Sequence, residues 1–506
     1  MPVVVDSSSM IFHGKAAREG YRSLMQTMNR KIGVGVLWNL ASLFLTRGAS
    51  TIFMLFLARL LEPEAFGLVA MATVVFELAN AFINSGLGAA LIRSKTVSDA
   101  DLNTVFYTNL LLSLVAYTAL FAGAPYIAAF YSQPELTTLI QVMGLVVFIN
   151  AAKVVQIAVL SRRMDFKTQM KANAASVLVS GCLAVAAALS GWGVWSLVVQ
   201  MLSSALVSAL LLWFISKWRP LFLFSIESFS RLFHFGRNLL AEGLLQILFE
   251  NSYVLVIGRF FSAELTGLYF LAKKLSNLIS QQLTNAVQQA TFPALSTLQD
   301  DNKVLLHKYR QIMQLMMFLI APIMGLLAGL APVLFKLMFD ERWLGAVPYL
   351  QLLCVVGALY PLHALNVNLL NVKGRSDLVL KVGLVKKSVN LTLLFIAIPY
   401  GVFGIVVSQV VGSFVALIPN TYFSVRLVGY SLTDQVRDIT KPLLAALASG
   451  FASWWLAGQG DQNLPLWLIG GGTVGLVTYT AVSLLIRVEG ATLLFKKVKG
   501  RKFTMG

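Results

Sequence analysis

Long apolar runs separated by short basic segments fill this 506-residue sequence, and they constrain its fold more than any other feature. A helix needs about 20 mostly apolar residues to cross the hydrocarbon core of a bilayer. Only 12% of the residues are charged, whereas soluble domains carry roughly 25%. A soluble core cannot bury so much apolar surface, so we expect lipid to surround the chain.

The runs predict an all-α polytopic membrane protein with about fourteen transmembrane helices. The predicted spans are 33–58, 66–90, 104–131, 136–160, 172–190, 193–216, 234–258, 265–289, 309–331, 345–370, 380–400, 402–425, 440–458 and 464–486.

Basic residues fall in every second connecting segment, which fixes the expected orientation. One side holds clusters such as Arg162, Arg163 and Lys167, whereas the other side holds only Arg59, Arg259, Lys336 and Arg342. Lys and Arg accumulate in cytoplasmic loops. With an even number of spans, both termini should therefore be cytoplasmic.

The net charge of +18 does not indicate a nucleic-acid partner, because the basic residues are spread over short loops instead of forming a patch on a soluble module. The basic tail around 496–502 is expected to rest on anionic membrane lipids.

A repeated motif predicts two related halves. ARLLEPEAFGL at 58–68 and GRFFSAELTGL at 258–268 both follow a predicted span, and GVWSLVV at 193–199 matches GVFGIVV at 401–407. The first pair lies six spans apart, an even number, so both halves should point the same way through the membrane. We therefore expect two parallel six-helix lobes around a central cavity.

The corresponding domain boundaries follow from the spans. They are a basic cytoplasmic N-terminal segment 1–32, an N-lobe 33–216, a cytoplasmic linker 217–233, a C-lobe 234–425, two further spans within 440–486, and a basic cytoplasmic tail 487–506.

Polar residues recur at helical spacing in the first two spans of each half. Such stripes are costly against lipid and predict the lining of a hydrated cavity. Polar side chains also pair helices with one another, and that alternative stays open. The expected lining residues are Asn39, Thr46, Thr73, Glu77, Asn80, Asn84, Asn277 and Gln281.

Charges inside the spans are mostly positive and predict a cavity that prefers an anion, since Arg and Lys bind phosphate oxygens well. The candidate substrate-binding cations are Arg47, Lys153, Arg237, Lys273 and Lys274. Lys386 and Lys387 lie near the start of a span and are expected to extend toward the headgroups. Glu242 and Glu250 either couple transport to protons or sodium, or pair structurally with the cations.

Other chemistry is sparse. The sequence lacks the phosphate-binding pattern GxxxxGK[ST], its four histidines show no metal-ligand spacing, and no loop is long enough to fold as a catalytic domain. We therefore expect a transporter with no catalytic residues, no metal and no cofactor.

Three segments carry a family resemblance: LARLLEPEAFGLVAMATVV at 57–75, INSGLGAALIRSKTVSDADLNTVFYTNL at 83–110, and QLLCVVGALYPL at 351–362. The chain resembles Wzx-type polysaccharide flippases of the polysaccharide transporter group, especially the colanic-acid type, within the multidrug/oligosaccharidyl-lipid/polysaccharide exporter superfamily. The resemblance implies alternating access in a bacterial inner membrane. It also implies an undecaprenyl-diphosphate-linked oligosaccharide as substrate, moved to the periplasmic leaflet for exopolysaccharide, capsule or O-antigen assembly, with polymerase and export proteins as further partners.

Three other functions stay open. A flippase for peptidoglycan lipid precursors would share the spans and the cationic cavity. A multidrug cation antiporter of the same superfamily would need an acid on the first span, where this chain has Arg47. A membrane polysaccharide polymerase would need a large outer loop.

Overall fold

The computed structural model describes residues 46–83, 86–458 and 463–491, with the backbone alone at 83, 235–239 and 290. These residues form helices and no strand, which confirms the expected all-α fold. The first described helix covers residues 46–60. The rest of the N-terminal half contains α2 (Pro63–Ile83), α3 (Leu87–Arg93), α4 (Asp99–Tyr131), α5 (Leu136–Met143), α6 (Leu145–Ala151), α7 (Val154–Arg162), α8 (Phe166–Leu189) and α9 (Trp195–Ile215).

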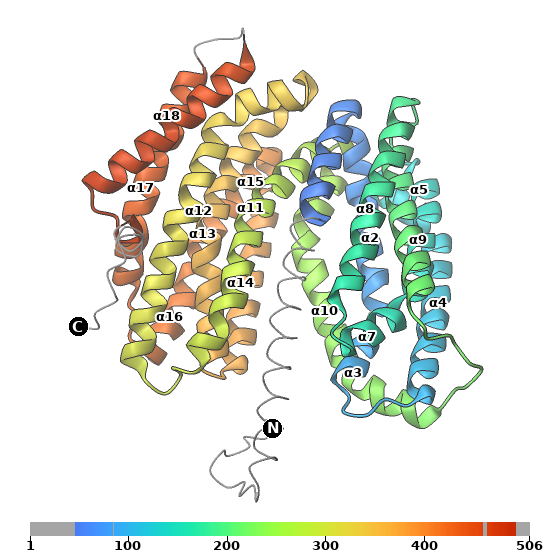
Figure 1. The fold of residues 1–506 in the computed structure, drawn as a ribbon. Helices are drawn as coiled ribbons and strands as arrows, with labels where there is room; N and C mark the ends of the chain where they lie inside the picture. The colour runs from blue at the N-terminus through green and yellow to red at the C-terminus, as the bar shows by residue number, and fades with distance from the viewer. Residues whose placement is uncertain (1–45, 84–85, 459–462, 492–506) are drawn as a thin grey trace, which may run out of the picture.

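The C-terminal half repeats this arrangement and extends it. It contains α10 (Ile226–Phe260), α11 (Ala263–Ser296), α12 (Asn302–Met338), the 3₁₀ helix η1 (Glu341–Ala346), α13 (Val347–Val372), α14 (Ser376–Ala397), η2 (Ile398–Tyr400), α15 (Gly401–Val415), α16 (Leu417–Val428), α17 (Leu432–Ala457) and α18 (Leu464–Leu485). The two halves form two separate bundles, blue to green and yellow to red in Figure 1.

The helices agree with about fourteen membrane crossings. Ten helical segments in the described ranges are long and apolar enough to cross a membrane, and one of them, Ser376–Val428, joins α14 to α16 and is long enough for two crossings. α11, α17 and helix 46–60 fall outside these ten, yet each coincides with a predicted span. α11 carries many polar residues, and those face the space between the lobes, as described below.

The repeated motif lies where the two lobes cross. α2 and α11 pack closely at Gly67 and Gly267, because these residues have no side chain. Any side chain there would collide with the backbone of the opposite helix. A Cβ on Gly67 would lie 1.8 Å from the carbonyl oxygen of Ala263, and a Cβ on Gly267 would lie 1.8 Å from that of Pro63. Pro63 and Ala263 are also 200 residues apart, so the repeat relates the two contacts. We call this part of the molecule the crossing end.

The two motif arginines both contact the opposite half at the crossing end, one through a hydrogen bond and the other through an aromatic ring. Arg59 donates a hydrogen bond to the Leu337 carbonyl near the end of α12, at 3.3 Å. The Arg259 guanidinium lies 5.3 Å from the ring centre of Phe130 near the end of α4. Each arginine thus joins its own half to the third long helix of the other half, which explains why the motif occurs twice.

The loop after α12 reinforces this contact. Trp343 of η1 is fully buried and meets Phe66 of α2 edge to face, with ring centres 5.2 Å apart. The Glu341 backbone N–H donates to Asp340 at 2.6 Å, and together with Arg342 it holds the pKa of the Asp340 carboxyl below its usual range. The segment between α12 and α13 therefore packs on both lobes.

A second pair of matched glycines supports the repeat. Gly193 lies two residues before α9 and Gly401 begins α15, and both have positive φ, 53° and 72°. Glycine adopts such backbone angles without the steric cost that other residues meet. The shared sequence Gly-Val thus has a glycine with positive φ before or at the start of the corresponding helix in each half.

α10 joins the lobes. It begins at Ile226, inside the segment predicted to be a linker, and packs against α2, α3 and α4 of the N-lobe as well as α11 and α14 of the C-lobe. Arg231 forms an ion pair with Asp101, which caps the start of α4. The start of α10 is thus fixed to the N-lobe, although the sequence assigned residues from 234 onward to the C-lobe.

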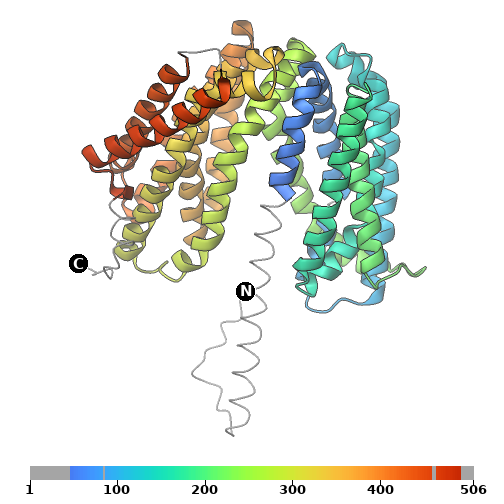
Figure 2. The same cartoon turned by 45° about the horizontal axis from the view of Figure 1, so that its top comes forward.

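α17 and α18 cover the side of the C-lobe that lies away from the N-lobe (Figures 1 and 2). Small residues let their backbones approach closely: Gly329 of α12 faces Gly450 of α17, and Ser453 donates to the Gly471 carbonyl of α18 at 2.9 Å. The GGGT sequence at 470–473 is therefore a helix-packing element. At the end opposite to the crossing, the two lobes diverge in Figure 2.

Candidate functional site

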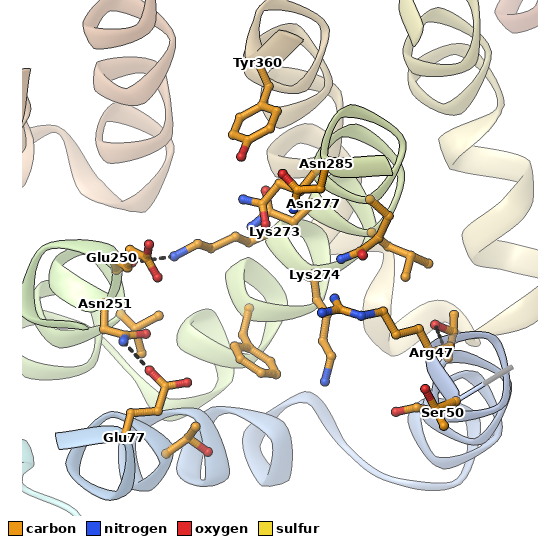
Figure 3. Close-up of a pocket in the computed structure, with 18 residues that line it drawn as sticks. Arg47, Ser50, Glu77, Glu250, Asn251, Lys273, Lys274, Asn277, Asn285 and Tyr360 are labelled. Atoms are coloured by element: carbon orange, nitrogen blue, oxygen red, sulfur yellow. Dashed lines mark hydrogen bonds between the residues drawn. The ribbon is translucent and has the colours of Figure 1, made fainter. Parts of the chain in front are cut away.

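A cavity of about 810 Å³ lies between the lobes. Helix 46–60 and α2 of the N-lobe, α10 between the lobes, and α11 and α13 of the C-lobe contribute its walls (Figure 3). Of the residues predicted to line a central cavity or bind there, nine lie in these walls: Thr46, Arg47, Thr73, Glu77, Glu250, Lys273, Lys274, Asn277 and Gln281.

Three cations and two carboxylates line this cavity, so its formal charge is 3 − 2 = +1. Lys273 is already engaged, because its Nζ donates to the Glu250 carbonyl oxygen at 2.8 Å. Arg47 and Lys274 differ from it: among the residues that the structure describes, neither has a carboxylate within 4 Å. Both side chains are exposed to the cavity and project into it in Figure 3.

The two acids are held by amides. Asn251 of α10 donates to Glu77 Oε2 of α2 at 2.6 Å, which joins the two helices across the cavity. Gln246 donates to Glu250 one helical turn away. The carboxylates therefore have hydrogen-bond partners of their own and leave the charge of Arg47 and Lys274 available.

The polar face of α11 is narrower than the sequence suggested. Asn277 and Gln281 follow Lys273 at intervals of four and line the cavity. Ser280 and Thr284 are buried instead, and their hydroxyls donate to carbonyls one turn earlier in the same helix. Ser280 packs against α13, where a Cβ on Gly357 would lie 3.4 Å from the Ser280 Cβ, so this residue belongs to helix packing instead of the cavity lining.

Three predicted site residues lie away from the cavity walls. Asn80 accepts a hydrogen bond from Asn150 of α6 at 3.3 Å. Lys153 occupies the break between α6 and α7 and contacts Ser208 of α9 at 3.5 Å, inside the N-lobe. Glu242 is exposed on α10 and does not belong to the cavity lining. The spacing of polar residues alone could not distinguish the helix face that lines the cavity from the face that packs against neighbouring helices of the same lobe.

Three further predictions lie outside what the structure describes. Asn39 and Asn84 fall outside the described residues, and Arg237 is described by its backbone alone. Their roles stay predictions, as do the binding and coupling roles of the nine lining residues.

Several lining residues were not predicted: Thr51, Asn251, Gln282, Asn285 and Tyr360. A signal was present for Asn285, which continues the interval of four from Asn277 and Gln281. Asn251 follows Glu250 directly, and its side chain turns toward Glu77 instead of following the stripe of α10. Tyr360 comes from a span that carries no polar stripe.

Two more pockets adjoin the central cavity. An apolar groove of about 590 Å³ shares Arg47, Thr51 and Gln282 with it and is bordered by Ile52, Ile279, Leu283 and Ile323. Ile52 and Ile323 are exposed, so this groove reaches the surface of the helices. A polar pocket of about 440 Å³ between α10 and the C-lobe helices α11, α13 and α14 shares Tyr360 with the cavity. We call them the apolar groove and the C-lobe pocket.

The arrangement suits binding rather than bond-making chemistry. Within the described ranges, no group of three or more His, Cys, Asp or Glu residues could hold a metal ion. What the cavity offers is unneutralised positive charge, carboxamides and hydroxyls next to an apolar surface.

Comparison with known proteins gives a family and a fold. Residues 56–348 match the family described as "Polysaccharide biosynthesis protein". The chain is 27% identical to the succinoglycan biosynthesis transport protein ExoT of Rhizobium meliloti, over 94% of this chain and 97% of that protein. It is 26% identical to the lipopolysaccharide biosynthesis protein WzxC of Escherichia coli, over 71% of this chain and 74% of that protein. Among solved structures, the lipid II flippase MurJ in an inward closed conformation matches with a TM-score of 0.70 and 14% identity, over 89% of this chain and 99% of that one.

Proposed function

The chain belongs to the polysaccharide biosynthesis protein family, and we propose that it is a flippase for undecaprenyl-diphosphate-linked oligosaccharides. It would move these repeat units from the cytoplasmic to the periplasmic leaflet of a bacterial inner membrane, with both of its termini in the cytoplasm. A relative over 94% of the chain is a succinoglycan biosynthesis transport protein, and another over 71% is a lipopolysaccharide biosynthesis protein. Both favour this substrate class over peptidoglycan precursors and drug cations, and the first favours transport over catalysis.

The order of the three pockets carries the proposal. The apolar groove adjoins the cationic cavity, and the cavity adjoins the C-lobe pocket, because neighbouring pockets share lining residues. A lipid-linked oligosaccharide has the same order of chemistry: an apolar chain, an anionic diphosphate and a hydroxyl-rich glycan. One molecule can therefore place each part in a matching environment.

The cations of the cavity hold the diphosphate. Arg47 can bind phosphate oxygens through two parallel N–H groups, and Lys274 contributes a point charge from the facing helix. Both lie next to the apolar groove, since Arg47 lines the groove as well as the cavity. The polyprenyl chain stays in the groove and the surrounding lipid, so only the polar headgroup has to cross inside the protein.

Transport requires the crossing end to open. The distribution of basic loops supports a periplasmic position for the crossing end, because the basic clusters fall on the other side of the predicted spans and only a few basic residues, among them Arg59, Arg259 and Arg342, lie here. Contact between Gly67 and Gly267 then closes the cavity to the periplasm, and separation of α2 from α11 would expose it. Rocking of the two lobes about the cavity alternates access between the leaflets.

Glu250 is the better placed of the two acids proposed for proton or sodium coupling. It lines the cavity, and the backbone carbonyl of the same residue accepts from Lys273, whereas Glu242 lies elsewhere on α10. Binding of a cation at Glu250 would bias the position of α10, which contacts both lobes.

The test is deletion of the gene followed by mass spectrometry of lipid-linked glycans. We expect polymer export to stop and an undecaprenyl-diphosphate-linked repeat unit to accumulate on the cytoplasmic side, with reversal by the intact gene. Loss of polymer without such accumulation would contradict the proposal and indicate an enzyme of assembly instead.

A further inference from the structure

The C-lobe pocket has its own chemistry, separate from that of the cationic cavity. Its polar walls come from α10, α11, α13 and α14, through Gln246, Gln288, Asn371, Tyr360 and Lys386. Three of these are carboxamides, which bind hydroxyl groups both as donors and as acceptors. Its volume of about 440 Å³ lies within the range of small-molecule sites, roughly 300–1,000 Å³.

Lys386 is the charged residue of this pocket. No carboxylate belongs to its described lining, and within the described chain Lys386 has no carboxylate within 4 Å. It is half-buried on α14, ten residues beyond the start of that helix at Ser376, about 15 Å along the helix axis. A lone cation at that depth is costly and indicates a binding role.

The neighbouring Lys387 has a different environment from that of Lys386. Lys387 lies over the face of Phe249 of α10, with its Nζ 4.7 Å from the ring centre. Its charge therefore has a partner, and it does not line the C-lobe pocket. The sequence predicted the same behaviour for both lysines, whereas the structure separates them.

His363 forms a wall of the pocket and does not compete with Lys386. One ring nitrogen contacts Ser413 Oγ at 3.0 Å and the other contacts Asn420 Nδ2 at 2.8 Å. Both nitrogens are thus used within the lobe. If the Asn420 amide donates to Nδ1, the remaining proton lies on Nε2, and the ring is neutral. The ammonium of Lys386 is then the single full charge in the described lining.

We propose that the C-lobe pocket recognises a sugar of the repeat unit that carries a carboxylate, with Lys386 as its counter-ion and the carboxamides as partners of its hydroxyls. This inference rests on the proposed function and adds a substrate class to it. The pocket adjoins the cavity at Tyr360, so a glycan attached to a diphosphate near Arg47 and Lys274 extends directly into it. A carboxylate matches the single positive charge of Lys386, whereas the diphosphate matches Arg47 and Lys274, the two cavity cations without a described carboxylate within 4 Å.

The experiment compares two substrates in liposomes that contain the purified full chain. One is an undecaprenyl-diphosphate oligosaccharide with a uronic acid residue, and the other is the same molecule with that carboxyl reduced to a primary alcohol. The concentration for half-maximal translocation is measured for both. We expect the intact protein to prefer the acidic glycan. The Lys386→Gln variant should raise the half-maximal concentration of the acidic glycan about tenfold and leave that of the reduced glycan unchanged.

Two further variants control for folding and for charge. Lys386→Arg should keep the preference for the acidic glycan, and Lys387→Gln should leave both values near those of the intact protein. Equal use of the two glycans by the intact protein, or an equal loss for both in Lys386→Gln, overturns the inference while the proposed function stands. Failure of the intact protein to move either glycan overturns the proposed function, and the inference falls with it.

Discussion

Arg47 and Lys274 face each other from different lobes and carry charge that no described carboxylate neutralises within 4 Å. This sets them apart from Lys273, which donates to the Glu250 carbonyl, and from Lys153, which lies inside the N-lobe. At the residue scale, the account therefore assigns the diphosphate to one pair of side chains among the five cations that the sequence suggested.

Substitution of this pair tests the assignment. A hydrogen bond to a charged group is worth about 1.5–3 kcal/mol, roughly a tenfold to hundredfold change in binding. We expect Arg47→Ala and Lys274→Ala each to lower polymer export by at least about tenfold in a deletion strain, at unchanged protein level in the membrane. Lys381→Ala is a matched control, because Lys381 is exposed on α14 and lines none of the described pockets. Normal export by both cavity variants contradicts the assignment.

The sequence predicted which kinds of side chain line the cavity better than it predicted which individual residues do so. Nine expected residues line it because apolar spans leave polar side chains few places away from lipid. Asn80 was expected at the cavity but contacts Asn150 of α6, since an intramembrane polar residue can be satisfied by either environment. Lys386 was expected to extend toward the headgroups, and only the packing of α13 against α14 shows the pocket beside it.

At the scale of helices, the crossing of α2 and α11 decides which end of the cavity is closed. The contact depends on two glycines whose Cβ atoms would each lie 1.8 Å from a backbone carbonyl oxygen. Backbone atoms cannot move aside as a flexible side chain can, so any substitution must push the two helices apart. The repeat in the sequence predicted two related halves, but only the structure shows that its two copies contact each other.

Gly67→Ala should therefore open the crossing end. We expect the distance between spin labels at Glu135 and Tyr400, in the loops after α4 and α14, to increase in the distribution measured by electron paramagnetic resonance. Export should fall, since the open state no longer alternates. Gly243→Ala is the control, because a Cβ at Gly243 meets nothing within 4 Å. An unchanged distance distribution in Gly67→Ala would show that the crossing does not hold the lobes together.

A buried ion pair attaches α17 to the C-lobe. Arg310 of α12 binds both carboxylate oxygens of Asp438 at 2.8 Å, and Gln314 and Tyr430 also donate to this carboxylate. Asp438 is almost fully buried. Removing one partner of a buried pair leaves a charge without compensation, at a cost of roughly 3–5 kcal/mol.

Arg310→Ala should consequently lower the thermal unfolding temperature of the purified protein in detergent. The expected loss of stability is about 3 kcal/mol, the lower end of this range, because Arg310 is partly exposed. Arg375→Ala serves as the comparison, since its pair with Asp377 is exposed on both sides and should matter little. Equal unfolding temperatures for Arg310→Ala and the intact protein would show that α17 is held by its small-residue packing alone.

At the scale of the whole molecule, two like-oriented lobes enclose a chamber with an apolar groove on one side and a carboxamide-rich pocket on the other. Composition predicted the membrane fold, because that follows from the transfer of apolar side chains from water to lipid. The repeated motif, six spans apart, predicted the two parallel halves. The order of the pockets could not be predicted, since it depends on which helices from distant parts of the chain meet around α11.

Translocation by the purified protein tests the central claim most directly. Liposomes containing the chain and an undecaprenyl-diphosphate oligosaccharide are treated with an external glycosidase that cannot cross the membrane. We predict that the fraction of cleaved glycan exceeds the outer-leaflet share with the intact protein and returns toward that share with Arg47→Ala combined with Lys274→Ala. Cleavage confined to the outer leaflet with the folded, intact protein would contradict the account.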